Sequence, residues 1–261
     1  MLIMLPMVVV AQNGIDGTWR MNLKKAQIDT KPQVYELKDG MYSCATCESK
    51  DKVKADGQDH KVAGNPYMDT MSVAVVSGTT IEEVGKKDGK VTFRDTKTVS
   101  ADGNMLSEKF EWHPAGSEQA ANGTAMLSRI GHPATGAHAI SGSWKTEKYD
   151  TMSDNALTFM YVPEGDGLKY KASTGETYSA TFDGKDYPYQ GDPATTAVVL
   201  KKIDNQTFEE TYKRKGEVVG VSRMTISPDG KSLTIVSEDK VRGRTDNWVA
   251  EKQEGNQEAS E

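Results

Sequence analysis

The sequence is poor in features that mark several common classes of protein. It has no run of five basic residues, and its formal net charge is −6 with a pI near 5.4. Proteins that bind nucleic acid or an anionic membrane surface through charge carry a basic patch, so the composition argues against both classes. The N-terminal apolar run, residues 2–10, is too short to cross a bilayer, which needs about 20 residues. We therefore expect no transmembrane segment in the mature protein and no nucleic acid as a partner.

The sequence also lacks the motifs of common catalytic sites. It contains neither a Gly-x-Ser-x-Gly nucleophile elbow nor a phosphate-binding loop, and none of its four histidines belongs to a two-His metal motif. We therefore predict that the protein is not an enzyme and that it needs neither a metal nor another cofactor.

The first residues, MLIMLPMVVVAQ, have the form of the apolar part of a secretory signal peptide. Val9, Val10 and Ala11 suit cleavage before Gln12, although no Lys or Arg precedes the apolar run. We interpret residues 1–11 as a signal peptide with a shortened start, and a hydrophobic first strand is the alternative. The mature protein is then expected to be exported, either periplasmic or extracellular.

One turn-rich phrase occurs twice in the chain. DGQDHKVAGNP begins at Asp56, and DGKDYPYQGDP begins 127 positions later, at Asp183. The match at this spacing extends without a gap over residues 39–106 of the first copy, and GTWR at Gly17 has a counterpart, GSWK, at Gly142. Self-similarity of this extent indicates a duplicated unit, and each copy is long enough to close a core of its own.

Each copy has the pattern of an antiparallel β-meander. Runs rich in Val, Thr, Tyr, Phe and Ile alternate with short turns such as Asp88-Gly89, Asp102-Gly103, Lys215-Gly216 and Asp229-Gly230. Type I′ hairpin turns need positive φ, which Gly and Asp tolerate, so these pairs are expected to join neighbouring strands. Each copy provides about eight strands, and closure into a barrel would remove the exposed edges of the sheet.

We therefore predict an all-β chain of two tandem antiparallel meander β-barrels, produced by an internal duplication. The first barrel covers residues 12–130 and the second covers residues 140–252. The stretch between them, GHPATGAHA at 131–139, is typical of a linker, and the polar residues 253–261 are expected to form a disordered tail. A single continuous barrel of about sixteen strands is the alternative arrangement.

The GTW and GSW openings resemble the Gly-x-Trp motif of lipocalins and lipocalin-like barrels. In that family the Trp closes one end of the barrel, and a basic residue from the last strand packs across it. The resemblance implies that Trp19 and Trp144 are barrel plugs, with Arg129 and Lys252 as their basic partners. The chain after residue 11 also resembles a family of uncharacterised exported bacterial proteins with a GTWKLN-like opening and repeated ADGK and DGKxYPxxG phrases. An ordinary core position for each Trp is the alternative.

The two cysteines, Cys44 and Cys47, lie close together in YSCATCES. At the 127-residue spacing they match Lys171 and Thr174, so the duplicated fold does not require them. In an exported protein such a pair favours a disulfide. The alternatives are a redox-active thiol pair, a zinc half-site with His60 nearby, and an inert dithiol.

Alternation places an acidic residue of each copy on the same strand face as apolar residues. Phe208, Glu210 and Tyr212 share one face, and Glu83 has the equivalent place in the first copy. A carboxylate that faces into a barrel must be paired, hydrogen-bonded or protonated. These four residues, with Tyr187 at a Pro-containing corner near a barrel mouth, are the candidate ligand-binding residues. Solvated glutamates on bulged or edge strands are the alternative.

The favoured hypothesis is an exported binding protein of the bacterial envelope that takes a small apolar or amphipathic molecule without catalysis. One alternative is a structural or protein-interaction module whose barrels are solid. Another is a thiol redox or metal-dependent enzyme built around Cys44 and Cys47. A cavity would separate the first two hypotheses, because small barrels can be filled by their own side chains. The sequence does not indicate the oligomeric state.

Overall fold

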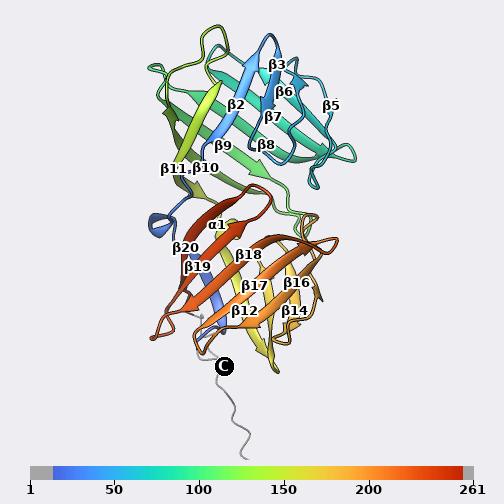
Figure 1. Ribbon diagram of the computed structural model, residues 1–261, viewed down its shortest axis with the longest axis vertical. Coiled ribbons are helices and arrows are strands. Elements are labelled where there is room, and N and C mark those ends of the chain that lie inside the picture. Colours follow the sequence, from blue (N-terminus) through green and yellow to red (C-terminus); the bar gives the residue numbers. More distant parts are fainter. Residues whose placement is uncertain (1–13, 255–261) are drawn as a thin grey trace, which may run out of the picture.

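The computed structural model describes residues 14–254, and nearly all regular structure in that range is β-strand (Figure 1). The helical segments of this range are the 3-10 helix η1 (Leu23–Lys25) and the α-helix α1 (Asp154–Leu157). Neither is long and apolar enough to cross a membrane. The predicted signal peptide and all but two residues of the predicted tail lie outside the described residues.

The strands form two separate sheets of ten strands each, and every pairing within them is antiparallel. Each sheet curls into a nearly closed barrel, and the two barrels are stacked end to end (Figure 1). The predictions of an all-β fold and of two barrels are confirmed. The alternative of one continuous barrel is wrong, because no strand pairing within residues 14–254 joins the two sheets.

The two barrels have the same strand order. In the first barrel the sequence of neighbours is β4 (Val53–Lys54), β3 (Met41–Cys44), β2 (Gln33–Lys38), β11 (Gly142–Met152), β10 (Ala121–Ile130), β9 (Met105–Trp112), β8 (Lys90–Val99), β7 (Thr80–Lys87), β6 (Thr70–Val75) and β5 (His60–Lys61). In the second barrel it is β14 (Thr177–Thr181), β13 (Gly167–Ala172), β12 (Thr158–Glu164), β1 (Gly17–Met21), β20 (Arg244–Lys252), β19 (Ser232–Asp239), β18 (Glu217–Ile226), β17 (Thr207–Arg214), β16 (Ala197–Lys202) and β15 (Tyr187–Pro188).

The strands that carry the Gly-x-Trp motif are exchanged between the barrels. β1 pairs with β12 and β20 of the second barrel, whereas β11 pairs with β2 and β10 of the first. The predicted barrel boundaries, 12–130 and 140–252, are therefore wrong for these two strands. The physical reason is that GTWR and GSWK present nearly the same pattern, so either strand fits either barrel and the connections decide between them.

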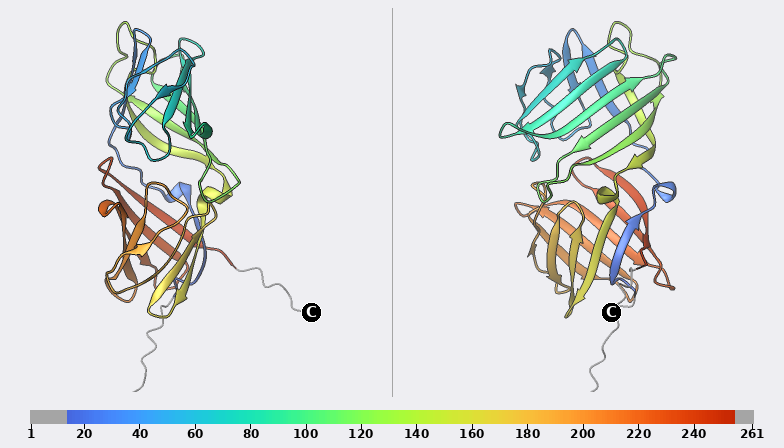
Figure 2. Two further views of the ribbon diagram at one scale, coloured as in Figure 1. Left: turned by 90° about the vertical axis from the view of Figure 1, so that its right-hand side faces the viewer. Right: turned by 180° about the vertical axis from the view of Figure 1, so that it is seen from behind.

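The chain consequently crosses between the barrels twice. The first crossing follows β1 and contains η1, and the second follows β11 and contains α1. Both helices lie at the waist of the molecule (Figure 2). The predicted linker at 131–139 is not one of these crossings, because β10 and β11 pair along their length within the first barrel. Its Pro and Gly residues serve a loop between neighbouring strands, at the end of the first barrel that lies away from the second (Figure 1).

The tight turns that the sequence predicted do close hairpins. Asp88 and Gly89 have φ values of 49° and 76°, and Lys215 and Gly216 have 53° and 86°. Two consecutive residues at positive φ are the signature of a type I′ turn, whose twist matches that of the strands it joins. The hairpins of both copies are thus set by local sequence.

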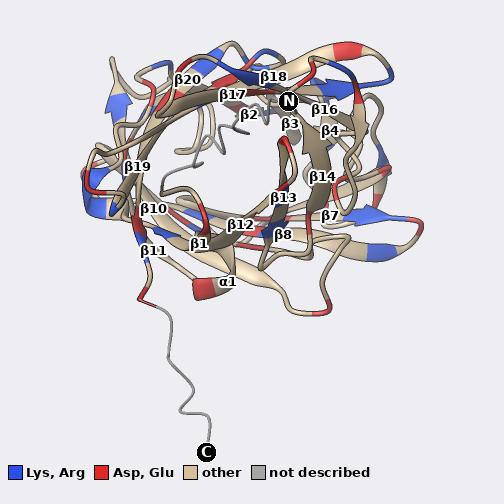
Figure 3. Ribbon diagram, turned by 90° about the horizontal axis from the view of Figure 1, so that it is seen from below, with Lys and Arg blue, Asp and Glu red and all other residues tan. Residues whose placement is uncertain are grey.

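The facing ends of the two barrels contact each other through their loops. Seen along the long axis, the two rings of strands overlap (Figure 3). The Tyr67 hydroxyl of the first barrel donates to Asp192 of the second at 2.9 Å. The main chains of Gly116 and Gly175 approach so closely that a Cβ at Gly175 would lie 2.0 Å from the Gly116 carbonyl oxygen. Glycine is required at this junction because no larger residue would fit.

Candidate functional site

Each Gly-x-Trp strand brings its Trp against a basic residue directly opposite on the neighbouring strand, Arg129 on β10 or Lys252 on β20. The Arg129 guanidinium carbon lies 4.0 Å from the ring centroid of Trp144, and Lys252 Nζ lies 5.4 Å from that of Trp19. Both Trp side chains are fully buried, and each indole N–H donates at 2.8 Å to the carbonyl four residues earlier. The four residues implied by the resemblance therefore meet in two equivalent pairs.

The glycine of the motif makes room for the basic side chain. Gly17 and Gly142 have φ values of 119° and 135°, which side chains rarely adopt. A Cβ at Gly142 would lie 2.6 Å from Arg129 Nη1, and one at Gly17 would lie 3.0 Å from Lys252 Cε. Arg129 donates to three main-chain carbonyls at 2.6–2.8 Å, whereas Lys252 donates to one at 2.9 Å.

Glu83 lies inside the first barrel, as the alternation predicted, and is 5% exposed. Its Oε2 accepts a hydrogen bond from Lys97 Nζ at 3.0 Å, and the same ammonium group also donates to Asp95. Glu83 on β7 is directly opposite Asp95 on β8, and Lys97 on β8 is directly opposite Glu108 on β9. These four buried residues, Glu83, Asp95, Lys97 and Glu108, form what we call the acidic cluster.

The acidic cluster reaches across the lumen to the opposite wall of the barrel. The Tyr35 hydroxyl on β2 donates to Glu108 Oε1 at 3.0 Å, although two strands, β10 and β11, separate β2 from β9 in the sheet. Lys97 Nζ also lies 5.3 Å from the centroid of the Tyr35 ring. The cluster is therefore a property of the barrel interior and not of one strand face.

Burial changes the protonation of this cluster. Burial, together with the negative charges of Glu108 and Glu83, raises the pKa of Asp95 to about 8, although Lys97 acts in the opposite direction. Burial likewise raises the pKa of Glu108 against the opposing effects of Lys97 and of the Tyr35 hydrogen bond. Burial alone would lower the pKa of Lys97, but the two carboxylates that it contacts outweigh burial and raise it.

Two oxygen atoms of the cluster are left without a partner. Among the described residues, Glu83 Oε1 and Asp95 Oδ1 are buried atoms that make no hydrogen bond. A buried acceptor without a donor costs about 1–3 kcal/mol. Native structures contain few such atoms, and each therefore needs an explanation.

The equivalent glutamate of the second barrel has different hydrogen-bond partners. Glu210 is 1% exposed and accepts hydrogen bonds from the hydroxyls of Tyr161, at 2.8 Å, and of Tyr178 and Tyr212. Burial raises the pKa of Glu210, and the three hydrogen bonds partly offset this effect. Where the first barrel has Asp95, Lys97 and Glu108, the pairing register of the second gives Ser222, Met224 and Ile235.

The other two candidate residues of the second barrel lie apart from each other. Phe208 is buried and packs edge to face against Tyr161, with the ring centroids 5.7 Å apart. Tyr187 lies on β15, the last strand in the sheet order, where its hydroxyl contacts Thr181 and donates to Asp183 at 3.1 Å. The structure brings Phe208 and Tyr212 together with Glu210 and places Tyr187 on the terminal strand β15, where it packs against the same apolar core.

Cys44 and Cys47 form a disulfide, as predicted. The expected match of Cys44 with Lys171 is wrong by one residue. Cys44 is opposite Tyr35, and Tyr170 is opposite Tyr161, so Tyr170 has the place of Cys44 in the second barrel. The two hairpins have the same register, with Lys38 opposite Met41 and Glu164 opposite Gly167, so the one-residue shift between the copies arises after them.

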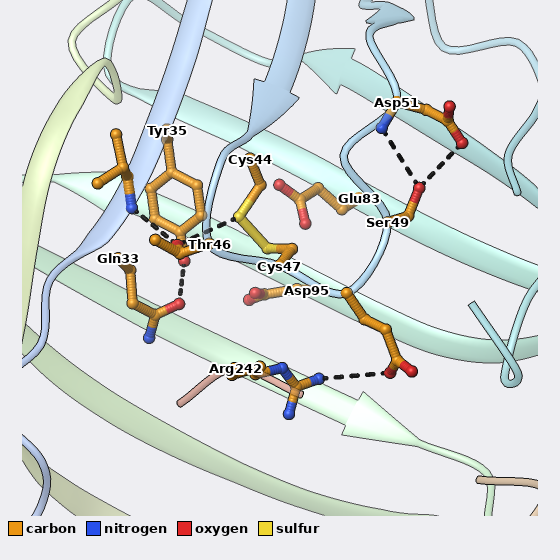
Figure 4. Close-up of a disulfide and its surroundings, with 12 residues drawn as sticks. Gln33, Tyr35, Cys44, Thr46, Cys47, Ser49, Asp51, Glu83, Asp95 and Arg242 are labelled. Carbon is orange, nitrogen blue, oxygen red and sulfur yellow. Dashed lines mark hydrogen bonds and ion pairs between the residues drawn. A yellow bond between two sulfur atoms is a disulfide. The ribbon is translucent and has the colours of Figure 1, made fainter. Parts of the chain in front are cut away.

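The disulfide lies where the two barrels meet. Figure 4 shows it in the same region as Glu83 and Asp95. Glu48, which follows the disulfide, is paired with two arginines of the second barrel, Arg214 at 2.7 Å and Arg242 at 4.0 Å. Among residues 14–254, no group of three His, Cys, Asp or Glu side chains is arranged to hold a metal ion.

Two hollows of the described chain lie away from the acidic cluster. One, of about 420 Å³, lies between the outer faces of β2 and β3 and the 131–139 loop. The other, of about 40 Å³, lies under the hairpin that joins β16 to β17. Neither is lined by a member of the acidic cluster.

Sequence reasoning missed Asp95, Lys97 and Glu108. The signal that would have found them is the same alternation, since Asp95 and Lys97 precede the buried Val99 at period two and Glu108 follows the buried Leu106. The chain matches no model of a known protein family, and no curated protein is detectably similar to it.

Proposed function

We propose that the protein is an exported binding protein whose first barrel holds a small molecule and whose second barrel is a structural half, with no catalysis in either. In this proposal the ligand is amphipathic and not purely apolar, because the charged groups of the acidic cluster require a polar partner. The disulfide supports export, since such bonds persist in oxidising compartments.

The observation that carries the proposal is the difference between two copies of one barrel. The second barrel closes with Ser222, Met224 and Ile235 at the positions that hold charged residues in the first. The fold therefore does not need these charges. Replacing buried ionic groups by apolar residues is often neutral or stabilising by about 1–4 kcal/mol. Charges that a fold can do without, and that cost stability, are typical of functional sites.

The other two hypotheses are less well supported. The hypothesis of a solid, structural barrel fits only the second barrel, where Glu210 has three tyrosine donors. A thiol redox centre fits poorly, because Cys44 is 5% exposed and lies on a strand. Reactive cysteines usually lie in accessible, electropositive surroundings such as a helix N-terminus. We therefore assign the disulfide a stabilising role.

The experiment is native mass spectrometry of the protein purified from its own host. The wild type is compared with the triple variant Asp95→Ser, Lys97→Met, Glu108→Ile, which imports the residues of the second barrel. We expect a co-purified small molecule with the wild type and none with the triple variant, while Glu210→Gln, as matched control in the other barrel, retains it. A molecule that stays bound to the triple variant, or is lost from the control, would contradict the assignment to the first barrel.

A further inference from the structure

We propose that the ligand of the first barrel carries an ammonium or guanidinium group, and that this cation binds between the carboxylates of Glu83 and Asp95. This inference rests on the proposed function and names the class of ligand for that site. It follows from the charge of the acidic cluster, the position of its free acceptor atoms and the comparison with Glu210.

The acidic cluster has more carboxyl groups than cations. Three carboxyl groups, those of Glu83, Asp95 and Glu108, share the single ammonium group of Lys97. From the facing strands come Tyr35, Tyr42 and Tyr149, whose pKa values are raised by burial, so they remain neutral.

A further cation that acts on the cluster is Arg244 of the second barrel. Its charge lowers the pKa of Glu108, and it is not among the main groups that shift the pKa of Asp95. The Glu83–Asp95 pair therefore shares the single positive charge of Lys97, so one of its two negative charges is not balanced when both carboxyl groups are ionised.

The free acceptor atoms lie on this same pair. Lys97 contacts Glu83 Oε2 and Asp95 Oδ2, which leaves Glu83 Oε1 and Asp95 Oδ1 without donors. Directly opposite residues of an antiparallel pair have Cβ atoms about 4.5–5.5 Å apart, so one donor group can reach both carboxylates. An ammonium group brings three N–H donors and a guanidinium brings five, together with the missing positive charge.

The second barrel shows what satisfies a glutamate at this position. Tyr212 donates to Glu210 from two residues along the same strand, and the equivalent residue of the first barrel is Gly85. Tyr161 also donates to Glu210, whereas its equivalent, Tyr35, donates to Glu108 instead. Neither of these two tyrosine donors is present at Glu83, where the neighbouring hydroxyl is that of Tyr42. A bound cation would supply donors to the two free oxygen atoms.

Protonation of Asp95 predicts that cation binding depends on pH. Without ligand, the proton that Asp95 holds below a pKa of about 8 reduces the negative charge of the pair. A cation competes with this proton, so its affinity should rise by up to about tenfold per pH unit from pH 6 to pH 8. A neutral ligand would show no such rise.

The test uses a series of probes of equal chain length, titrated into the full-length protein and followed by NMR. The probes are butylamine, butylguanidine, butanol and butyrate, at pH 6, 7 and 8. We expect the two cations to bind to the wild type more tightly than the alcohol or the carboxylate, with affinity rising with pH. Glu83→Gln should weaken cation binding at least tenfold, and Glu210→Gln should leave it unchanged. Asp95→Ser is the second variant, and circular dichroism shows whether each variant is folded.

The outcomes separate this inference from the proposed function. If butanol or butyrate binds as tightly as the amine, or if Glu83→Gln binds the cations as the wild type does, the cation class is wrong while binding stands. If no probe binds the wild type and no molecule co-purifies with it, both the inference and the proposed function are wrong.

Discussion

Glu83 and Glu210 occupy the same position in two copies of one barrel, and the two barrels solve the problem of a buried carboxylate in opposite ways. In the second barrel three tyrosine hydroxyls converge on Glu210, and its neighbours across the strands are Ser222, Met224 and Ile235. In the first barrel Glu83 is surrounded by further charges, and one of its oxygens has no partner.

The difference shows that one copy of a duplicated barrel can have a fully hydrogen-bonded interior while the other keeps buried charged groups that lack partners. A fully bonded polar network makes a barrel rigid, whereas a half-satisfied one costs stability unless something else completes it. The second barrel thus shows the requirements of the fold, and the first shows what was added to them. The predictions below test this division, from the largest expected effect to the smallest.

Removing either Trp should damage the barrel that the strand exchange assigns to it. Trp19→Ala and Trp144→Ala should each lower the free energy of unfolding by about 3–5 kcal/mol, because a large fully buried side chain is lost. Hydrogen exchange should show that Trp19→Ala exposes amides in residues 158–252, and that Trp144→Ala exposes amides in residues 33–130. The reverse pattern would contradict the strand exchange.

The two basic residues that pack across the Trp rings should contribute differently to the free energy of unfolding. Arg129→Ala should lower the free energy of unfolding by about 2–3 kcal/mol, since it removes several charge-assisted hydrogen bonds and a close cation–π contact. Lys252→Ala should cost about 1 kcal/mol, because it removes one such bond and a longer contact. Equal losses in urea titrations would show that the two barrel ends are equivalent after all.

The disulfide should stabilise the first barrel alone. Closing so short a loop is worth about 2 kcal/mol on the chain-entropy estimate, so Cys44→Ala with Cys47→Ala should destabilise the protein by that amount. Hydrogen exchange should show that the loss of protection in this double variant is greatest for the amides around β3. An unfolding free energy that is unchanged by reduction with dithiothreitol would contradict a stabilising role.

The acidic cluster should make stability fall as the pH rises from 5 to 8. The pKa of Asp95 is about 8 in the folded protein, against about 3.9 in an unfolded chain. Between these values the folded protein holds a proton that the unfolded chain has released, so raising the pH favours unfolding by at most about 1.4 kcal/mol per pH unit.

In thermal melts recorded between pH 5 and pH 8, Asp95→Ser should reduce the fall of stability with pH. Glu210→Gln should reduce it further, because the pKa of Glu210 is also raised. The carboxylates whose pKa values are lowered, such as Asp56 and Asp183, do not contribute in this window, since they are ionised throughout it in both states. Any slope that persists in the Asp95→Ser, Glu210→Gln double variant is expected from Glu108, whose pKa burial also raises, and its loss in the additional variant Glu108→Ile checks this.

Much of the fold could be predicted from local sequence. Asp-Gly and Lys-Gly turns fixed the hairpins, and the repeat fixed the number of barrels. The exchange of β1 and β11 could not be predicted, because both strands carry the same motif and pairing between distant segments leaves no local signal. The 131–139 stretch was misread for a related reason, since Pro and Gly suit a long loop and a linker equally.

The candidate site was predicted in part. Alternation correctly placed Glu83 and Glu210 inside the barrels. The same alternation places Asp95 and Lys97 inside, because both precede the buried Val99 at period two, although charged residues on a strand are usually solvated. The tyrosines that converge on Glu210 come from strands far apart in the chain, so only the closed barrel reveals them.

The strand exchange also bears on how the protein is made. β1 is the first strand of the barrels to be synthesised, yet one of its two neighbours, β20, is the last. Neither barrel can close on a ribosome while its final partner is still missing, and the second must wait for almost the whole chain. The first barrel can close once β11 has been made, whereas the second stays open until β20 joins β1, so the barrel that contains the first strand is completed last.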